Sequence, residues 1–402
     1  MTRLFVMTVG IALLLGLYVQ PASASKRLLV GIYDEAEFLG RPERSFPQLK
    51  RLRTKAVRAN LYWGGPNGVA RRRPARPTNP NDPAYDWFAY DRMVREAAKN
   101  KIKVIFAIVG TPRWANGGKP WNRAPRRALD LRRFAQAAAT RYSGYFAPGA
   151  AGAVPNSAGE AGERLPAVKY WLAWNEPNNP VFLYPQYKRV KRKGRAVRYV
   201  RQSARNYARI CNAVVSGVRG ARALRGEKIA CGVTAPRGNN CARCRRASMS
   251  PIVFARLMKR FGARGFDAFA HHPYYGHRSE TPTTKPRLVK GPRVVGGPVT
   301  LGNINDLIRE VTRLWGRKRI WITEYGFQTR PDRLFSVSYS KQARFLRQAF
   351  SIARGNPRID MMLWFLLRDQ PRYKRFDGWQ SGLMTRSGKR KPAFNAFLRV
   401  RK

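Results

Sequence analysis

From residue 28 onward the chain alternates short, nearly continuous apolar runs with longer segments whose apolar residues recur at helical spacing. An apolar run bounded by turn residues is typical of a strand that is covered on both faces. An amphipathic segment between two such runs is typical of the helix in a βα unit. Eight runs are predicted as strands, and they are 28–33, 56–62, 102–109, 168–174, 228–234, 266–271, 319–323 and 360–365.

The segments between these strands supply the predicted helices. Eight alternating units of strand and helix predict an α/β fold, the (β/α)8 or TIM barrel. Stretches 71–86, 148–166 and 276–302 lack both patterns and are predicted as long loops, so residues 25–402 are expected to form a single domain. The predicted helices are a stretch from about residue 43 and the ranges 87–100, 126–145, 199–220, 251–261, 303–315 and 340–354.

The first 24 residues have the pattern of a secretory signal peptide. Arg3 precedes an apolar stretch over 4–19, and the segment 22–24 (ASA) provides the small residues of a cleavage site. A retained membrane anchor is the alternative, but the apolar stretch is short for a membrane span. We therefore expect residues 1–24 to be removed and residues 25–402 to be secreted, either free or associated with the cell envelope.

Four cysteines, at positions 211, 231, 241 and 244, fit an oxidising compartment and allow three disulfide pairings. If Cys231 lies on a strand and faces the preceding helix, it can reach Cys211, which leaves Cys241 and Cys244 to close a small loop. This pairing is preferred, and the other two stay open. A zinc site would need a second Cys-x-x-Cys or Cys/His pair, so neither a metal nor another cofactor is predicted.

Polar and aromatic residues gather where the predicted strands end, and a barrel of this kind carries its chemistry at those points. The second strand ends near Arg58, Asn60 and Trp63, and the eighth carries Trp364. Further strand ends carry the segments 111–114 (TPRW), 174–178 (WNEPN), 271–275 (HHPYY) and 323–326 (TEYG).

Two carboxylates, Glu176 and Glu324, each follow directly on a predicted apolar strand, although the chain has only 22 acidic residues. An isolated carboxylate at such a place would be costly to desolvate. Two carboxylates across one pocket can break a glycosidic bond, because one donates a proton to the leaving oxygen and the other attacks the anomeric carbon. Simple pairing of each glutamate with an arginine is the alternative, and it explains two strand-end glutamates less well.

The sequence resembles clan A of the glycoside hydrolases, which includes families 5 and 39. The segments 174–178 (WNEPN) and 322–326 (ITEYG) carry most of the resemblance. It implies a (β/α)8 barrel and a retaining glycosidase that cleaves β-linked glycosides by double displacement. Supporting matches are 57–58 (VR), 111–115 (TPRWA), 272–274 (HPY), Trp364, 382–383 (GL) and 391–394 (KPAF).

The resemblance also implies a role for each matching residue. Glu176 would be the general acid/base and Glu324 the nucleophile. Asn175 would hold the sugar 2-hydroxyl, and Arg58 would keep Glu324 ionised, since an adjacent cation lowers the pKa of a carboxyl group. Three further substrate-binding residues are expected, namely Tyr274 hydrogen-bonded to Glu324, His272 on the first sugar subsite or else packed as a structural histidine, and Trp364 as the floor of that subsite.

The charge of the chain is extreme, with 79 Lys and Arg against 22 Asp and Glu and a net charge of +57. Because 44 % of the residues are hydrophobic and 12 % aromatic, the composition excludes a disordered basic tail. The densest basic segment, 188–205, has nine basic residues and no acid, and is expected to run from a loop into the next helix. Such a surface predicts an acidic glycan, an envelope polymer or DNA as a partner, and a biased composition is the alternative.

The competing function is a polyanion-binding extracellular protein in which the barrel is catalytically idle. Neither a helix-turn-helix, an RNA-recognition nor a zinc-finger pattern is present. The patterns HExxH and GxSxG and a cofactor-binding glycine fingerprint are also missing, and both glutamates are in place. The sequence therefore favours a secreted glycoside hydrolase with a carbohydrate substrate.

Overall fold

The computed structural model describes residues 28–149, 163–192, 195–286, 290–291, 294–373 and 378–402. The predicted signal peptide, 1–24, lies outside the described residues, as does most of the predicted loop 148–166. Within the described ranges, none of the helices has the length and apolar character that crossing a membrane requires.

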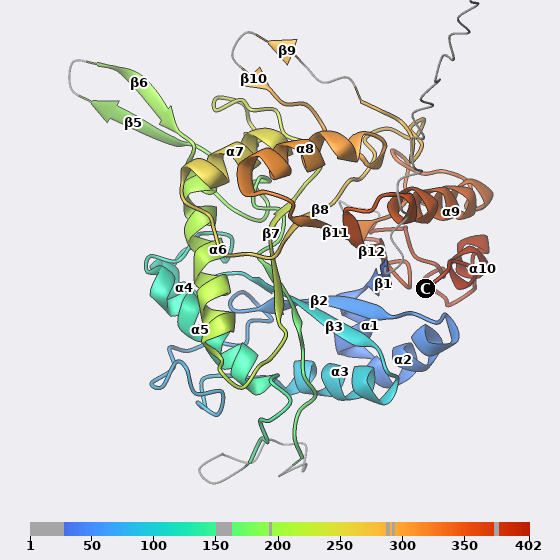
Figure 1. Cartoon of the computed structure of the whole chain (residues 1–402), viewed down its shortest axis with the longest axis horizontal. Helices are drawn as coiled ribbons and strands as arrows, with labels where there is room; N and C mark the ends of the chain where they lie inside the picture. Colours follow the sequence, from blue (N-terminus) through green and yellow to red (C-terminus); the bar gives the residue numbers. More distant parts are fainter. Residues whose placement is uncertain (1–27, 150–162, 193–194, 287–289, 292–293, 374–377) are drawn as a thin grey trace, which may run out of the picture.

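Eight parallel strands close into a barrel that is surrounded by helices (Figure 1), which confirms the predicted (β/α)8 TIM barrel. The barrel closes where the first strand pairs with the last, with Val30 opposite Met362. In their order around the barrel the strands are β1 (Leu29–Tyr33), β12 (Ile359–Phe365), β11 (Arg319–Tyr325), β8 (Ala268–His271), β7 (Lys228–Thr234), β4 (Tyr170–Ala173), β3 (Lys103–Val109) and β2 (Ala56–Tyr62).

The helical layer contains the predicted helices and three helices outside the predicted ranges, over 35–40, 113–116 and 392–398. The predicted helix from residue 43 is preceded by a separate short helix, because Pro42 begins a new helix at its first position, where a proline is tolerated. The helices are α1 (Glu35–Gly40), α2 (Pro42–Arg51), α3 (Phe88–Lys99), α4 (Arg113–Asn116), α5 (Ala128–Arg141), α6 (Gln202–Gly220), α7 (Pro251–Arg260), α8 (Ile304–Trp315), α9 (Tyr339–Gly355) and α10 (Pro392–Leu398), with a 3-10 turn η1 (Leu301–Asn303).

The basic segment after β4 differs from the prediction. The strands β5 (Lys188–Arg192) and β6 (Arg195–Val200) form an antiparallel hairpin, with Lys188 opposite Val200, that projects from the body beside α6 (Figure 1). The helix that was predicted to begin at residue 199 begins at Gln202. Valine and tyrosine in β6 favour extended backbone, and this local preference outweighs the helical spacing. The predicted loop 276–302 also contains two short strands, β9 (Lys290–Gly291) and β10 (Val294–Val295).

Side chains along each barrel strand alternate between the barrel interior and the surrounding helical layer. On β3, Ile105, Ala107 and Val109 belong to the interior cluster, whereas Val104 and Phe106 belong to the outer one. On β2 the interior face begins with Ala56 and then becomes polar at Arg58 and Asn60. The barrel interior is therefore apolar at its amino end and polar at its carboxyl end, where the predicted site lies.

Both disulfides preferred from the sequence are formed. Cys211 on α6 is bonded to Cys231 on β7, and Cys241 is bonded to Cys244 in the loop between β7 and α7. The first bond fastens a helix to the barrel wall, and the second closes a loop near the carboxyl mouth. Disulfides of this kind are typical of proteins from oxidising compartments.

Candidate active site

A cavity of about 560 Å³ opens at the carboxyl end of the barrel, and Glu176 and Glu324 both line it. Its volume lies within the ~300–1,000 Å³ that small-molecule sites usually have. Aromatic rings form much of its wall, including those of Tyr274, Phe365 and Trp379. The cavity thus combines two carboxylates with apolar ring faces, as the strand-end residues predicted.

A strained turn after β4 positions Glu176. Trp174 and Glu176 have φ angles of 72° and 38°, in a region that is unfavourable for residues other than glycine. Two backbone hydrogen bonds hold the turn, because Trp174 N donates to Ile108 O at 2.9 Å and Glu176 N donates to Val233 O at 2.9 Å. The neighbouring strands therefore impose a backbone geometry that this sequence would not adopt alone, and the carboxylate is directed into the cavity.

Asn178 fastens the same turn to the loop after β7. Its side chain is fully buried, its Oδ1 accepts from Ala235 N at 2.8 Å, and its Nδ2 donates to the carbonyl oxygens of Ala235 and Met249. Replacement by alanine would leave these buried backbone groups without partners, each at a cost of about 1–3 kcal/mol. We expect Asn178→Ala to lower the free energy of unfolding by about 2–4 kcal/mol, measured by urea denaturation. Asn179→Ala, in the same turn but on the cavity wall, is the control and should change stability much less.

A bulge in β11 positions Glu324. The strand was predicted to end at residue 323, but it continues to Tyr325 and so contains Glu324. Between Ile322 and Tyr325 it has one residue more than the facing part of β12, where Met362 and Trp364 are the partners. A bulge interrupts the alternation of side chains and can re-aim one of them. Thr323 and Glu324 consequently both reach the polar end of the barrel.

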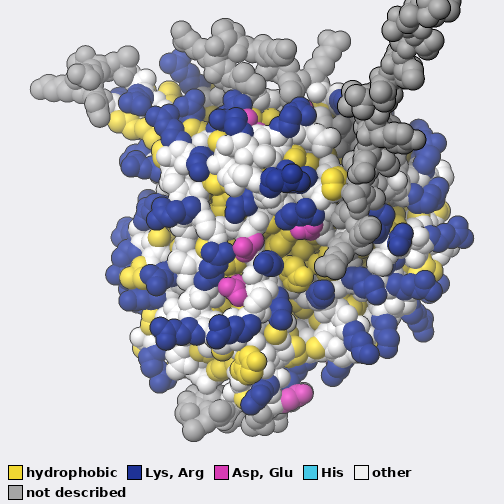
Figure 2. Space-filling view, in the orientation of Figure 1, with side chains coloured by type: hydrophobic (Ala, Val, Ile, Leu, Met, Phe, Trp, Pro, Cys, Tyr) yellow, Lys and Arg dark blue, Asp and Glu magenta, His cyan; other side chains and the backbone are white. Residues whose placement is uncertain are grey.

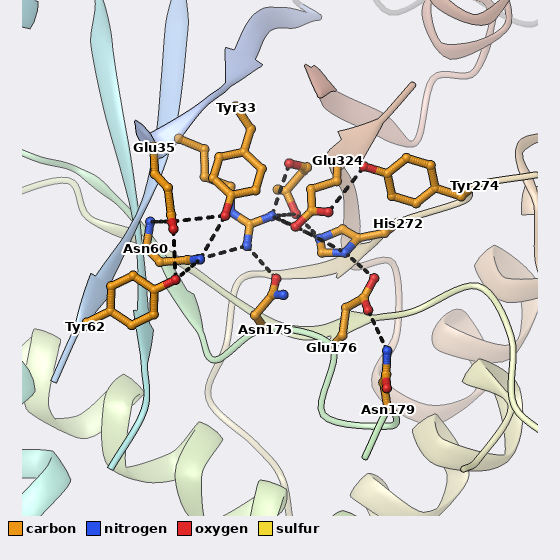
Figure 3. Close-up of polar contacts among 12 residues, drawn as sticks. Tyr33, Glu35, Asn60, Tyr62, Asn175, Glu176, Asn179, His272, Tyr274 and Glu324 are labelled. Carbon is orange, nitrogen blue, oxygen red and sulfur yellow. Dashed lines mark hydrogen bonds and ion pairs between the residues drawn. The ribbon is translucent and has the colours of Figure 1, made fainter. Parts of the chain in front are cut away.

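Arg58 is the centre of the polar network, and its side chain is fully buried on β2. Its Nη1 donates to Oε1 of Glu324 at 2.8 Å, and its Nη2 donates to Oδ1 of Asn175 at 2.6 Å and to Oδ1 of Asn60 at 3.3 Å. The structure thus brings Arg58 and Asn175 to Glu324, as the resemblance implied. Tyr274 joins the group from the other side, because its hydroxyl donates to Oε2 of Glu324 at 3.3 Å (Figure 3).

His272 lies between the two glutamates and is fully buried, and it is not part of the cavity wall. Its Nε2 faces Nη1 of Arg58 at 3.1 Å, which can only donate, so Nε2 accepts and the neutral ring carries its proton on Nδ1. That Nδ1 donates to Oε1 of Glu176 at 3.1 Å. Burial lowers the pKa of His272 to about 3, which keeps the ring neutral. Of the two predicted roles, the packed histidine describes its position better than a direct sugar contact.

Burial raises the pKa of both glutamates, but their neighbours differ. For Glu176 the pKa rises to about 7, with a hydrogen bond from Asn179 as the main opposing effect. For Glu324 the pKa also rises, while His272, Arg58 and the Tyr274 hydroxyl all act to lower it. Because the guanidinium is bonded to Glu324 and not to Glu176, the network favours a proton on Glu176 and a charge on Glu324. Oxygens of the two carboxyl groups lie within 4.8 Å of each other.

Trp364, predicted as the floor of the sugar subsite, lies elsewhere. It is fully buried in the outer cluster, and its indole nitrogen donates to Ser381 O at 2.9 Å. The reason is the alternation along β12, where Met361 and Leu363 point inward and Met362 and Trp364 point outward. The next residue, Phe365, lines the cavity, and its ring centroid is 6.0 Å from that of Trp379, which also lines it. Phe365 and Trp379, and not Trp364, therefore present aromatic rings to the cavity.

Glu35 is a cavity residue that sequence reasoning missed. It begins α1 directly after β1, so the rule that singled out Glu176 and Glu324 applies to it as well. Its carboxylate accepts from the hydroxyls of Tyr62 at 2.9 Å and Tyr33 at 3.1 Å and from Asn60 N at 3.3 Å (Figure 3). Burial raises its pKa, and these three hydrogen bonds oppose the rise.

Within the described ranges, one group of side chains, namely Glu176, His272 and Glu324, has its ligand atoms close enough to hold a metal ion. The Nη1 of Arg58 lies 2.8 Å from Glu324 and 3.1 Å from His272, so a fixed cation already balances this carboxylate. A second cation between the same groups would be repelled by the guanidinium. The donor set therefore suits proton transfer better than metal binding.

Two carboxylates at the carboxyl mouth of a (β/α)8 barrel are an arrangement that glycoside hydrolysis can use. In sequence, residues 299–397 match the family described as Glycosyl hydrolase catalytic core. No curated protein matches the chain in sequence. The fold is that of the clan A glycosidases, which confirms the resemblance found in the sequence.

Three solved structures illustrate the similarity of fold. A family 39 glycoside hydrolase from the gut symbiont Bacteroides cellulosilyticus WH2 has a TM-score of 0.57 and 17 % identity, over 93 % of this chain and 63 % of that one. A glucosidase from Croceicoccus marinus has a TM-score of 0.62 and 14 % identity, over 95 % of this chain and 68 % of that one. A family 1 β-glucosidase from Thermotoga maritima has a TM-score of 0.56 and 12 % identity, over 94 % of this chain and 97 % of that one. The chain thus spans less than two thirds of the first of these proteins.

Proposed function

We propose that this protein is a retaining glycoside hydrolase that cleaves β-linked glycosides with Glu176 as acid/base and Glu324 as nucleophile. The observation that carries the proposal is a pair of carboxyl groups on one cavity, with one oxygen of each within 4.8 Å of the other and an arginine bonded to only one group. Retaining enzymes hold the two groups about 5–5.5 Å apart, whereas inverting enzymes leave room for a water at about 6.5–9.5 Å.

In the first step, a carboxylate oxygen of Glu324 attacks the anomeric carbon and forms a glycosyl ester. The bond from that carbon to the leaving oxygen breaks, and Glu176 gives its proton to that oxygen. Arg58 keeps Glu324 ionised before attack, and the Tyr274 hydroxyl orients the other carboxylate oxygen. Asn175, held by Arg58 at 2.6 Å, is placed to bind the 2-hydroxyl, a contact that strengthens in the transition state.

In the second step, the ionised Glu176 removes a proton from water, and the resulting nucleophile attacks the anomeric carbon. The ester bond to Glu324 breaks, and the product keeps the configuration of the substrate. Neutral His272 keeps its proton and donates a hydrogen bond from Nδ1 to Oε1 of Glu176, which fixes the direction of that carboxylate. Each glutamate returns to its starting protonation state.

The test is a panel of aryl β-glycosides and neutral and acidic polysaccharides, assayed with the mature protein. Hydrolysis with retained configuration, followed by NMR of the first product, supports the proposal. Inversion, or equal rates for the wild-type protein and Glu324→Gln, contradicts it. The assays should start with the aryl glycosides, because the signal from the released aryl group does not depend on the length of a polysaccharide chain.

A second proposal concerns the basic surface, which we infer binds an anionic polymer outside the cavity. Lys and Arg cover the visible face with few acidic side chains between them (Figure 2), and Lys188 and Arg189 are exposed on the projecting hairpin. Such a surface suits an acidic glycan, an envelope polymer or DNA in the extracellular space where the predicted signal peptide directs the protein. The intact pair of glutamates favours an enzyme with this surface over an idle barrel.

This proposal predicts a steep salt dependence. Affinity for an anionic glycan should fall by about 10³-fold or more between roughly 50 and 200 mM salt if six or more charges take part. Replacing Lys188 and Arg189 by glutamate should weaken binding more than the same change at Arg344 and Arg347, which are exposed on α9. Retention on an anionic column, with and without salt, measures both effects. Equal effects of the two double variants would show that no particular surface binds the polymer.

A further inference from the structure

Neutral groups hold the carboxylate of Glu35 on the cavity wall. The carboxylate of Glu35 accepts hydrogen bonds from three donors, and all of them are neutral. They are the hydroxyls of Tyr33 and Tyr62 and the backbone N–H of Asn60. Among the ion pairs between described residues none involves Glu35, although the chain has 79 basic residues. Other scarce acids do pair, for example Asp91 with Arg141 and Asp369 with Lys391. The fold therefore holds this carboxylate on the cavity wall without a direct ion pair, and the nearby Arg58 acts to lower its pKa.

Neutral donors fix the orientation of Glu35 and leave part of its hydrogen-bonding capacity for a ligand. A carboxylate has about four acceptor positions, and three are occupied. The tyrosines that hold it are themselves fixed, since Nδ2 of Asn60 donates to the Tyr33 hydroxyl at 2.8 Å and to the Tyr62 hydroxyl at 3.3 Å. Charge-assisted hydrogen bonds to a carboxylate are roughly twice as strong as neutral ones. A ligand with hydroxyl groups would satisfy the remaining capacity.

The position of Glu35 indicates which part of the substrate it would meet. The chain of hydrogen bonds runs from Glu324 through Arg58 and Asn60 to Tyr33 and Glu35. Figure 3 shows Glu35 and Tyr62 at one end of this network and Glu176 with Asn179 at the other. Since the acid/base marks the side of the leaving group, Glu35 lies on the side of the glycone, the sugar whose anomeric carbon reacts.

We propose that Glu35 accepts a hydrogen bond from a hydroxyl of the glycone and thereby selects a neutral sugar and rejects a uronic acid. This inference rests on the proposed function and narrows its substrate class. A uronate carboxyl group next to Glu35 would place two like charges together on the cavity wall, where Glu35 has no direct ion pair to offset the repulsion. The anionic polymer proposed for the basic surface would then contact the outside of the protein, and its acidic groups would stay out of the glycone position.

The experiment compares 4-nitrophenyl β-glycosides of neutral sugars with the corresponding glucuronide. The wild-type protein should cleave its best neutral substrate at least about 100-fold faster than the glucuronide. Glu35→Gln should lower kcat/KM on the neutral substrate by about 10- to 100-fold, the usual effect of losing a charged hydrogen bond. The preference over the glucuronide should also shrink by about tenfold. Glu43→Gln, the same charge change at an exposed site on α2, is the control and should alter neither value.

Deoxy sugars separate direct contact from a structural role. Removing the hydroxyl that Glu35 binds should cost the wild-type protein about tenfold in kcat/KM and cost Glu35→Gln much less. If Glu35→Gln fails to fold, Glu35→Asp can replace it in the same comparison of deoxy sugars. Aspartate keeps the negative charge, but its shorter side chain moves the carboxylate away from the ligand. Equal deoxy penalties in both proteins, or a preference for the glucuronide, would overturn the inference while leaving the hydrolase intact. Absence of hydrolysis on the whole panel would instead overturn the proposed function, and the inference with it.

Discussion

Replacing Glu324 by glutamine should lower kcat/KM by at least about 10⁴-fold on any glycoside that the wild-type protein cleaves. Glutamine keeps the size of the side chain and a carbonyl oxygen for Nη1 of Arg58, which now donates to Oε1 of Glu324 at 2.8 Å. An amide oxygen is a poor nucleophile and cannot form the glycosyl ester. The measurement is kcat/KM on an aryl glycoside, with the product's configuration followed by NMR.

Two controls make this result specific. Asp360→Asn removes a carboxylate that pairs with Arg319 at the other end of the barrel and should leave kcat/KM unchanged. Tyr274→Phe removes only the hydroxyl that donates to Glu324 and should lower kcat/KM by about tenfold.

A slow 2-deoxy-2-fluoro glycoside should leave a covalent sugar on the peptide that contains Glu324. Label on another residue, or activity of Glu324→Gln within tenfold of wild type, would show that Glu324 is not the nucleophile.

The fold and the central residues could be predicted because both depend on short-range patterns. Apolar runs of strand length, separated by amphipathic segments, are enough to predict eight units. Parallel strands in a barrel end on the same face, so Asn175, Glu176 and Glu324 are expected to lie close together at their strand ends. Arg58 is the third residue of β2, and its contact with Glu324 was implied by the resemblance. The pairing of Cys211 with Cys231 followed in the same way from their places on a helix and the next strand.

The remaining features depend on details that a pattern of apolar runs does not contain. Trp364 was placed on the wrong face because a shift of one position along a strand reverses its side chains. Glu324 lies within β11 and not after it. The bulge that directs its side chain depends on how β11 pairs with β12, and a pattern of apolar residues does not show this pairing. Among the strands that the structure describes, β5 and β6 pair with each other alone, so no core pattern marks this hairpin. The predicted strand ends with polar residues begin at the second strand, so Glu35, which follows β1, is not among them.

Glu176→Gln should lower kcat/KM by about 10²- to 10⁴-fold for glycosides with a poor leaving group, which is the usual effect of losing a general acid. Substrates with a strongly acidic phenol as leaving group should be much less affected in the first step, because a phenolate departs without a proton. Azide should then accelerate turnover, since no carboxylate remains to repel the anion or to activate water. Equal losses on both classes of substrate would contradict a role for Glu176 as the acid.

The pH dependence of kcat/KM provides an independent test of the same residue. Because burial raises the pKa of Glu176 to about 7, the protonated acid is present below that pH, and kcat/KM should fall as the pH rises through about 7. Glu176→Gln should lose this alkaline limb. Asn179→Ala should instead move the limb to higher pH, because the hydrogen bond from Asn179 Nδ2 to Oε2 of Glu176, 3.1 Å long, stabilises the ionised form. A limb that persists in Glu176→Gln, or that moves to lower pH in Asn179→Ala, would assign the titration to another group.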